Sequence, residues 1–170
     1  MEPELRALVD KHSIMELCWQ YSRACDRLDR CLLERTYWPD GSDDHGTFKG
    51  SAPDYVDWVM ELLGSWISSQ HDNSNFLIEL DGDDAYGEVH WTGYYSFRIK
   101  GVAHDQLSAG RYLDHYQRRA GEWRILHRSC VSEWSRIEAA EQHWREHPVR
   151  GLLVGTRGRD DLVYRLRELG

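Results

Sequence analysis

The first third of the chain carries apolar residues at intervals of three and four, the pattern of helices that bury one face. Pro3 and Glu4 suit the first turn of a helix. Ser13 with Glu16 forms a capping-box pattern and predicts the start of a second helix, which we expect to end before the turn-rich stretch 39–43. The buried stripe of this second helix comprises Ile14, Leu17, Cys18, Tyr21, Cys25, Leu28 and Leu32.

A short strand over 45–48 and a third helix are expected next. Ser51 caps this helix and Pro53 lies in its first turn, and the apolar pattern continues to about Gln70. Its buried face comprises Tyr55, Val59, Leu62, Leu63 and Trp66.

From residue 71 the period changes from helical to alternating, which indicates strands. We expect strands over 71–80, 85–100 and about 106–119, and a fourth strand that begins near Trp123. Alternation predicts one interior face for the fourth strand. That face comprises Trp123, Ile125, His127, Ser129 and Val131.

Helices followed by long antiparallel strands predict an α+β fold. We expect a cone-shaped α+β barrel, in which the N-terminal helices pack against a strongly curved, mostly antiparallel sheet and leave an interior cavity. A chain of 170 residues suits one such domain, over 1–135. Residues 136–170 are expected to form a C-terminal helical extension of that domain, broken at His147–Pro148 and amphipathic over 159–169.

Composition excludes several classes of function. A net charge of −8 argues against nucleic acid as the main partner, because phosphate binding needs a basic patch. No apolar run approaches the length of a membrane span, and the acidic start lacks the apolar core of a signal peptide. We therefore expect a cytoplasmic protein whose cysteines are reduced core residues. These are Cys18, Cys25, Cys31 and Cys130.

The aromatic content favours a small-molecule pocket. Eight Trp and nine Tyr stand against three Phe, and Trp and Tyr combine apolar area with one polar group that can orient a ring. Neither metal nor cofactor is expected, because the sequence has no CxxC pair, no HExxH pattern and no phosphate-binding glycine loop. The groupings considered for a metal are His71 with Asp72, His45 with Asp43 and Asp44, and His143 with His147.

Five short motifs follow one another in an order that points to a family. They are the segment from Tyr21 to Asp26, the segment 37–40, His71, the segment 110–116 and the segment 121–125. Their order and spacing over about residues 8 to 135 resemble the SnoaL-like, scytalone dehydratase-like branch of the nuclear-transport-factor-2-like superfamily. The resemblance implies the same cone-shaped fold, a cofactor-independent activity and assembly into homo-oligomers, with trimers favoured. His90 and Arg128 would then suit an outward-facing interface.

The resemblance also implies a catalytic pair. Asp26, near the end of the first long helix, and His71, at the start of a strand, match the acid and the histidine base of that branch. Tyr21 stands five positions before Asp26, as in one of its dehydratase groups, and would be the third catalytic residue. With the aromatic pattern, the resemblance gives the substrate-binding candidates His45, Trp91, Tyr95, Tyr112 and His127. His45 falls where scytalone dehydratase has a water-holding Tyr.

The proposed pair has a clear chemical role. A histidine can take a proton from carbon, and a carboxylate on its other nitrogen fixes the tautomer and stabilises the imidazolium. The leading hypothesis is a lyase of the dehydratase or elimination type, acting on a hydrophobic, aromatic or polycyclic molecule. Retro-aldol or deformylating cleavage and double-bond isomerisation use the same base. A structural subunit like those of ring-hydroxylating dioxygenases, or an inert ligand-binding module, would need no such pair.

Structural roles remain open for each candidate. Asp26 could cap a helix, and Asp29 is an equal candidate by position for the partner of His71. His71 could be a boundary residue bonded to the backbone, and Tyr21 could be an ordinary core residue.

Overall fold

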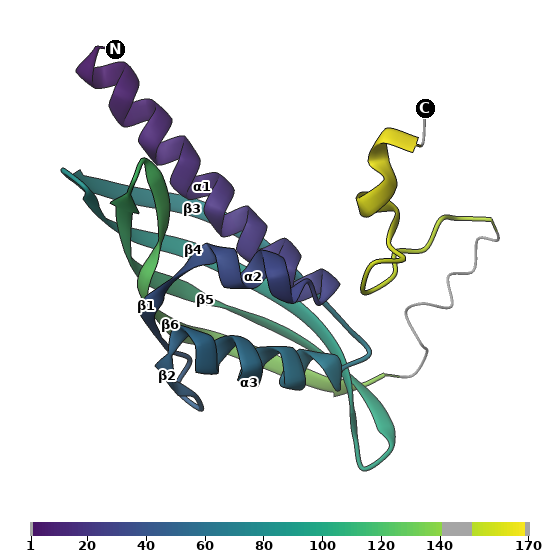
Figure 1. The fold of residues 1–170 in the computed structure, drawn as a ribbon. Helices are drawn as coiled ribbons and strands as arrows, with labels where there is room; N and C mark the ends of the chain where they lie inside the picture. The colour runs from purple at the N-terminus through teal and green to yellow at the C-terminus, as the bar shows by residue number, and fades with distance from the viewer. Residues whose placement is uncertain (1, 141–150, 169–170) are drawn as a thin grey trace.

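The computed structural model describes residues 2–140 and 151–168, in which helices pack against one curved sheet (Figure 1). The helices are α1 (Pro3–Arg27), α2 (Arg30–Thr36), α3 (Ala52–Gly64) and the 3-10 helix η1 (Leu162–Glu168). The strands are β1 (Tyr37–Asp44), β2 (Lys49–Ser51), β3 (Ser68–Asp81), β4 (Asp84–Ile99), β5 (Val102–Arg119) and β6 (Glu122–Ala139). Among the described helices, none is both long and apolar enough to cross a membrane.

α1 is one continuous helix, and the predicted start of a second helix at Ser13 is wrong. The Ser13 hydroxyl donates to the Val9 carbonyl at 2.9 Å, so it bonds back along the helix instead of capping a new one. The helix ends after Arg27 because Leu28 adopts a left-handed conformation with φ of 54°. Asp29 then caps α2, which breaks the apolar stripe that we expected to continue through one helix.

The segment that follows α2 also differs from the prediction. The turn expected over 39–43 lies inside β1, and the strand expected over 45–48 is the turn between β1 and β2. Pairing of β1 with β6 shifts register between Tyr37 and Ser42, and this irregularity accommodates Pro39 within a strand.

Ser51 caps α3 as predicted, because its Oγ accepts from the backbone N–H of Asp54 at 3.3 Å. The helix ends at Gly64 and not near Gln70, since the chain from Ser68 onward pairs with β4. Trp66 and Ile67, between α3 and β3, extend the apolar pattern beyond the end of the helix, which hides the boundary.

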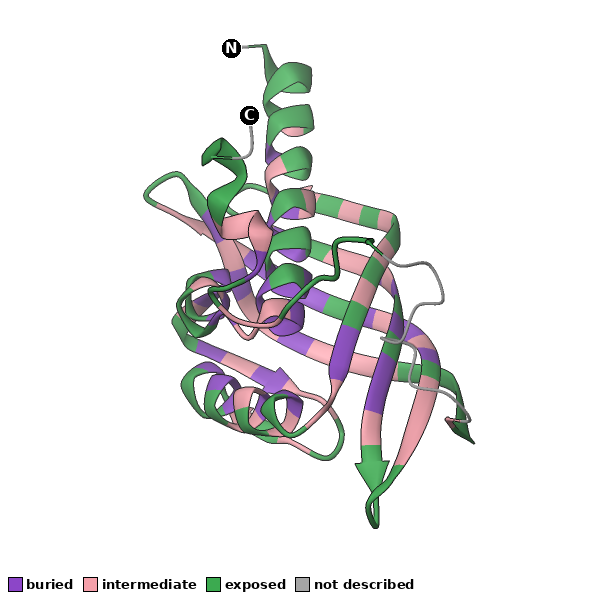
Figure 2. Cartoon of the chain, turned by 90° about the vertical axis from the view of Figure 1, so that its right-hand side faces the viewer, coloured by how far each residue is buried: buried purple, intermediate pink, exposed green. Residues whose placement is uncertain are grey.

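The sheet has the order β2-β1-β6-β5-β4-β3. All neighbours are antiparallel except β1 and β6, which are parallel. The predicted α+β class and the long middle strands are confirmed. The sheet does not close into a barrel, because β2 and β3 are its two edge strands. Figure 2 shows that buried residues gather where the helices meet the sheet, whereas the start of α1 and the β4–β5 turn are exposed.

A bulge in β6 reverses the predicted interior face of that strand. Tyr116 of β5 pairs with Ile125 and His115 pairs with His127, so Leu126 is an extra residue without a partner. From this point the parity changes. His127 lies on the outer face, against our expectation, and Arg128 turns into the core with 0% exposure instead of serving an outward interface.

Arg128 is the centre of a buried ion pair. Its Nε and Nη2 donate to the two carboxylate oxygens of Asp114 at 2.8 Å and 2.7 Å, and both side chains are fully buried. The guanidinium lies 4.2 Å from the ring centre of Tyr21 and 3.9 Å from that of Tyr112. The pair therefore fixes two aromatic rings by cation–π contact.

The C-terminal residues that are described pack against the helices. The backbone N–H of Gly158 donates to the Arg27 carbonyl at 2.8 Å, at the end of α1. Residues 136–139 belong to β6 and not to the helix that we expected there, and η1 covers only part of the predicted helix 159–169. The predicted break at His147–Pro148 lies outside the described residues.

The buried ion pair yields a stability prediction with a matched control. Arg128→Met leaves the Asp114 carboxylate buried without its cation, and we expect a loss of about 3–5 kcal/mol in the free energy of unfolding. Arg119→Met removes a second two-point Arg–Asp pair, with Asp40, which lies at the surface and should cost far less. Urea unfolding measures both, and equal losses would contradict the role given to Arg128.

Candidate active site

Asp26 holds His71 at two points. One carboxylate oxygen of Asp26 lies 2.7 Å from Nδ1 of His71, and the other accepts the backbone N–H of His71 at 2.9 Å. The two side chains are 11% and 8% exposed. With Nδ1 bound to the carboxylate, Nε2 is the nitrogen left to meet another group. Asp29 instead caps α2 and accepts a hydrogen bond from Tyr164 at 2.9 Å, so Asp26 is the partner of His71.

The position of β3 along α1 brings His71 next to Asp26. Asn73 lies on the same face of β3 as His71, because alternate residues of a strand share a face. Its side-chain amide donates to the Cys18 carbonyl at 3.1 Å and to the Ser22 hydroxyl at 2.9 Å, one turn before Asp26. Two alternate positions of the strand are thus tied to successive turns of the helix.

His71 Nε2 faces an interior cavity of about 120 Å³ between α1, α3 and the sheet. The Tyr95 hydroxyl lies 3.2 Å from this nitrogen. Gly93 pairs with His71 across the β3–β4 ladder, and a Cβ at Gly93 would stand only 1.9 Å from the Tyr95 hydroxyl. The missing side chain therefore provides the space that lets Tyr95 reach His71.

Most of the predicted site residues line this one cavity. Besides His71, the lining includes Tyr21, His45, Trp91, Tyr95 and Tyr112. The indole nitrogen of Trp91 is buried and has no oxygen or nitrogen acceptor among the described residues. A substrate oxygen in the cavity could accept this N–H. The roles of these lining residues in binding or catalysis remain predictions.

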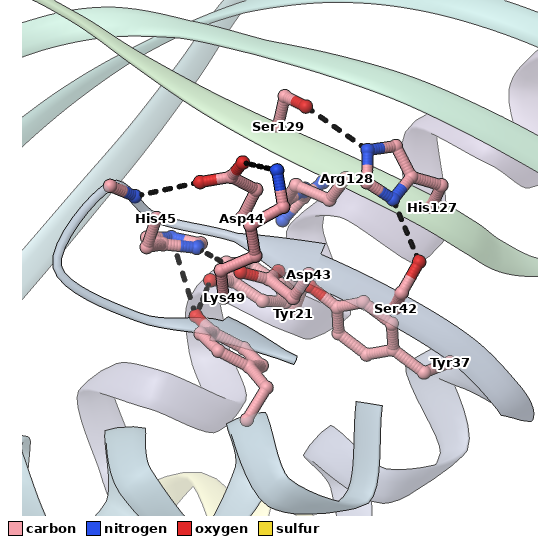
Figure 3. Close-up of polar contacts among 12 residues, drawn as sticks. Tyr21, Tyr37, Ser42, Asp43, Asp44, His45, Lys49, His127, Arg128 and Ser129 are labelled. Atoms are coloured by element: carbon pink, nitrogen blue, oxygen red, sulfur yellow. Dashed lines mark hydrogen bonds and ion pairs between the residues drawn. The ribbon is translucent and has the colours of Figure 1, made fainter. Parts of the chain in front are cut away.

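His127 is the exception, and its expected place in the pocket is wrong. Its Nδ1 lies 2.8 Å from the Ser42 hydroxyl and its Nε2 lies 3.1 Å from the Ser129 hydroxyl, on the outer face of the sheet (Figure 3). The bulge at Leu126 is the physical reason, because it shifts the alternation of β6 by one residue.

A second Asp–His pair, which we had considered only as a metal grouping, lies beside the same cavity. Nδ1 of His45 bonds to one oxygen of Asp43, and Tyr37 donates its hydroxyl to the other at 2.6 Å (Figure 3). His45 Nε2 lies 3.4 Å from the hydroxyl of Tyr55, which was predicted only as a core residue. The spacing of Asp43 and His45 was the available signal, because it places a carboxylate two residues from an imidazole at the end of β1.

No group of three or more His, Cys, Asp or Glu residues that could hold a metal ion occurs in residues 2–140 and 151–168. His143 and His147 lie outside these ranges, so that grouping has no structural description.

Burial raises the pKa of the cavity phenols well above the usual range. Desolvation is the main cause for Tyr21, Tyr55 and Tyr112, and it also raises the pKa of Tyr95. These hydroxyl groups stay protonated at neutral pH and can donate hydrogen bonds into the cavity.

The Asp26–His71 pair also borders an outer groove of about 430 Å³. Side chains of α1 and β3 form this groove together with Asp161 and Val163 of the C-terminal segment. His71 therefore stands between the interior cavity and a larger groove at the surface, which gives solvent protons a path to the pair.

The sequence model of the SnoaL-like domain matches residues 6–129, nearly all of the helices and sheet just described. The chain belongs to the SnoaL-like family. Among individual sequences, this SnoaL-like protein is similar to an uncharacterized protein of Mycobacterium tuberculosis. The two are 30% identical over 123 residues, which cover 70% of this chain and 82% of the relative. A counterpart from Mycobacterium bovis matches to the same extent.

Solved structures show the same fold. A type 2 hexachlorocyclohexane dehydrochlorinase superimposes with a TM-score of 0.77 at 19% identity, over 86% of this chain and 99% of that one. A type 3 enzyme from Novosphingobium barchaimii gives 0.72 at 20% identity, over 83% and 97%. A candidate scytalone dehydratase from Novosphingobium aromaticivorans gives 0.67 at 19% identity, over 87% and 97%. At these identities the likeness establishes the nuclear-transport-factor-2-like fold.

The cysteines test how well the interior is closed. Cys18 and Cys25 are buried and Cys130 is half-buried, and burial raises the pKa of all three thiols, to about 12 for Cys18 and Cys130. Cys31 is exposed, contrary to its predicted core position. Iodoacetamide at mildly alkaline pH should modify Cys31 alone in the native protein, because the thiolate reacts, and all four after unfolding. Mass spectrometry counts the labels, and rapid native labelling of Cys130 would contradict a closed cavity.

Proposed function

We propose that this protein is a cofactor-independent lyase that takes a proton from carbon next to a carbonyl group, with His71 as the base. The observation that supports it is the two-point contact of Asp26 with His71, which directs Nε2 into an aromatic cavity. Asp26 is proposed to hold the tautomer and to stabilise the imidazolium that forms. Histidine in this arrangement is a common general base.

The cavity supplies a group for the negative charge that develops on the carbonyl oxygen. Trp91 lines the cavity, and its buried indole nitrogen has no oxygen or nitrogen acceptor among the described residues. A donor aimed at such an oxygen stabilises the transition state. When the negative charge moves back from the carbonyl oxygen, the new C=C bond forms and a group on the next carbon is expelled. The reaction is therefore an elimination.

The volume of the cavity limits the substrate. An apolar protein cavity of about 150 Å³ holds benzene, and pockets for drug-sized ligands are about 300–1,000 Å³. At about 120 Å³ the cavity suits one six-membered ring or a smaller molecule. We therefore propose a substrate of single-ring size, at the small end of the aromatic or polycyclic class that the sequence suggested.

The named relatives support elimination over the alternatives. One is a dehydrochlorinase and another a candidate dehydratase, and both names describe loss of a small molecule from a substrate. Isomerisation and retro-aldol cleavage share the same base but expel no water or halide. A purely structural subunit would gain nothing from a carboxylate that holds the nitrogen of a cavity histidine.

Proton abstraction is testable without knowledge of the leaving group. Cyclohexanone in D₂O should exchange its α-protons faster with wild-type protein than in buffer, as followed by NMR. We expect His71→Ala to lower the protein-catalysed rate by about 10²–10⁴-fold, and Asp26→Asn to lower it by at least about tenfold because the wrong tautomer is then favoured.

His127→Gln is the matched control, since His127 lies outside the cavity. It should exchange at the wild-type rate. The proposal fails if wild-type protein adds nothing to the buffer rate, or if His71→Ala keeps full activity.

A further inference from the structure

Two histidines reach the same cavity from distant strands of the sheet. His71 lies on β3, at one edge, and His45 follows β1, which is separated from β3 by β6, β5 and β4. In each imidazole ring, one nitrogen is hydrogen-bonded to an aspartate and the other to a tyrosine hydroxyl. This duplication is unusual for a core, because buried carboxylates are costly unless they are paired.

The Asp43–His45 pair is held in place as closely as the Asp26–His71 pair. The Asp43 side chain is 0% exposed and that of His45 is 16% exposed. Tyr37 occupies the remaining oxygen of Asp43, so the carboxylate has a fixed orientation. The His45 ring stacks on Tyr55 with centroids 4.8 Å apart and planes 23° apart. Nδ1 is thus held, as in His71, and Nε2 is directed at a hydroxyl.

A continuous chain of polar groups leads from this pair to the centre of the cavity. His45 Nε2 lies 3.4 Å from the Tyr55 hydroxyl, and that hydroxyl is hydrogen-bonded to the hydroxyl of Tyr21. Tyr21 and Tyr55 both line the cavity. A proton can therefore pass from His45 through Tyr55 to Tyr21 without leaving the interior.

We propose that the chain Asp43–His45–Tyr55–Tyr21 supplies the proton for the leaving group, so that the base and the acid of the elimination come from separate parts of the fold. This inference rests on the proposed function. A departing hydroxyl needs a proton because hydroxide is a poor leaving group. With His71 alone, the base would have to carry the proton it has just removed to the oxygen itself.

The step balances as follows. His71 Nε2 takes the proton from the α-carbon, and the C–H electron pair forms the enolate. When the negative charge returns from the enolate oxygen, this pair becomes the new C=C bond. The C–O bond breaks with its electrons on oxygen, which takes the hydroxyl proton of Tyr21 and leaves as water. Tyr21 regains a proton from Tyr55, and Tyr55 from the His45 imidazolium. His71 ends protonated and His45 neutral, and exchange with solvent restores both.

The chemistry of the leaving group separates this role from a structural one. 3-Hydroxycyclohexanone and 3-chlorocyclohexanone both give cyclohexenone, which is followed by its ultraviolet absorbance after subtraction of the uncatalysed rate. Only the hydroxyl needs a proton, since chloride leaves unaided. His45→Gln keeps a polar side chain that cannot act as an acid, and Tyr55→Phe keeps the ring and removes the hydroxyl.

We expect both variants to lower turnover of the hydroxyl compound by at least about tenfold, toward the 10²–10⁴ of general acid catalysis, and to change turnover of the chloride by less than about threefold. His71→Ala should abolish both reactions, and His127→Gln should alter neither. Thermal unfolding checks that each variant is folded.

An equal fall with both compounds in His45→Gln and Tyr55→Phe would mean a structural role and would overturn the inference. An unchanged hydroxyl rate in both variants, or a wild-type protein that eliminates only chloride, would also overturn it. Deuterium exchange into cyclohexanone distinguishes the two proposals. Loss of exchange in wild type refutes the base, whereas intact exchange with an unchanged hydroxyl-to-chloride ratio refutes only the acid chain.

Discussion

The two-point contact between Asp26 and His71 is the constraint on which the rest of the site depends. One oxygen fixes the strand through its backbone N–H, and the other fixes the imidazole through Nδ1. The contact requires α1 to end at Arg27 and β3 to lie along α1 in one position. The side-chain amide of Asn73 holds β3 in that position. The proposed function thus rests on a helix end and an edge strand that meet in one relative position.

The interior is more polar than that of an ordinary core. Three of the buried aspartates lie around the cavity with a basic partner each: Asp26 meets His71, Asp43 meets His45 and Asp114 meets Arg128. Buried polar pairs of this kind add little net stability, which favours a role in positioning side chains. The Asp114–Arg128 pair lies against the rings of two cavity tyrosines, and it orients them without lining the cavity itself.

Periodicity was sufficient for the class of the fold and for the long strands, because each element repeats its pattern over many residues. The prediction from periodicity failed where a single residue interrupts the helical or alternating pattern. Leu28 ends a helix through a left-handed conformation that no apolar stripe reveals, and Leu126 forms a bulge that moves His127 outward and Arg128 inward. Asp26 and His71 could be paired only through the family resemblance, since 45 residues separate them and local patterns carry no such information. The partnership of Tyr55 with His45 depends on packing between α3 and β1, which alternation alone does not give.

The central claim is that the carboxylate of Asp26 keeps the proton of neutral His71 on Nδ1 and leaves Nε2 free to accept one. Nitrogen-15 NMR of the imidazole rings reports directly which nitrogen of a neutral histidine is protonated. The account predicts the Nδ1–H form for His71 in wild-type protein, and a shift toward the Nε2–H form in Asp26→Asn. An Nε2–H form of His71 in the wild type would contradict the account, because that nitrogen could then take no proton from a substrate.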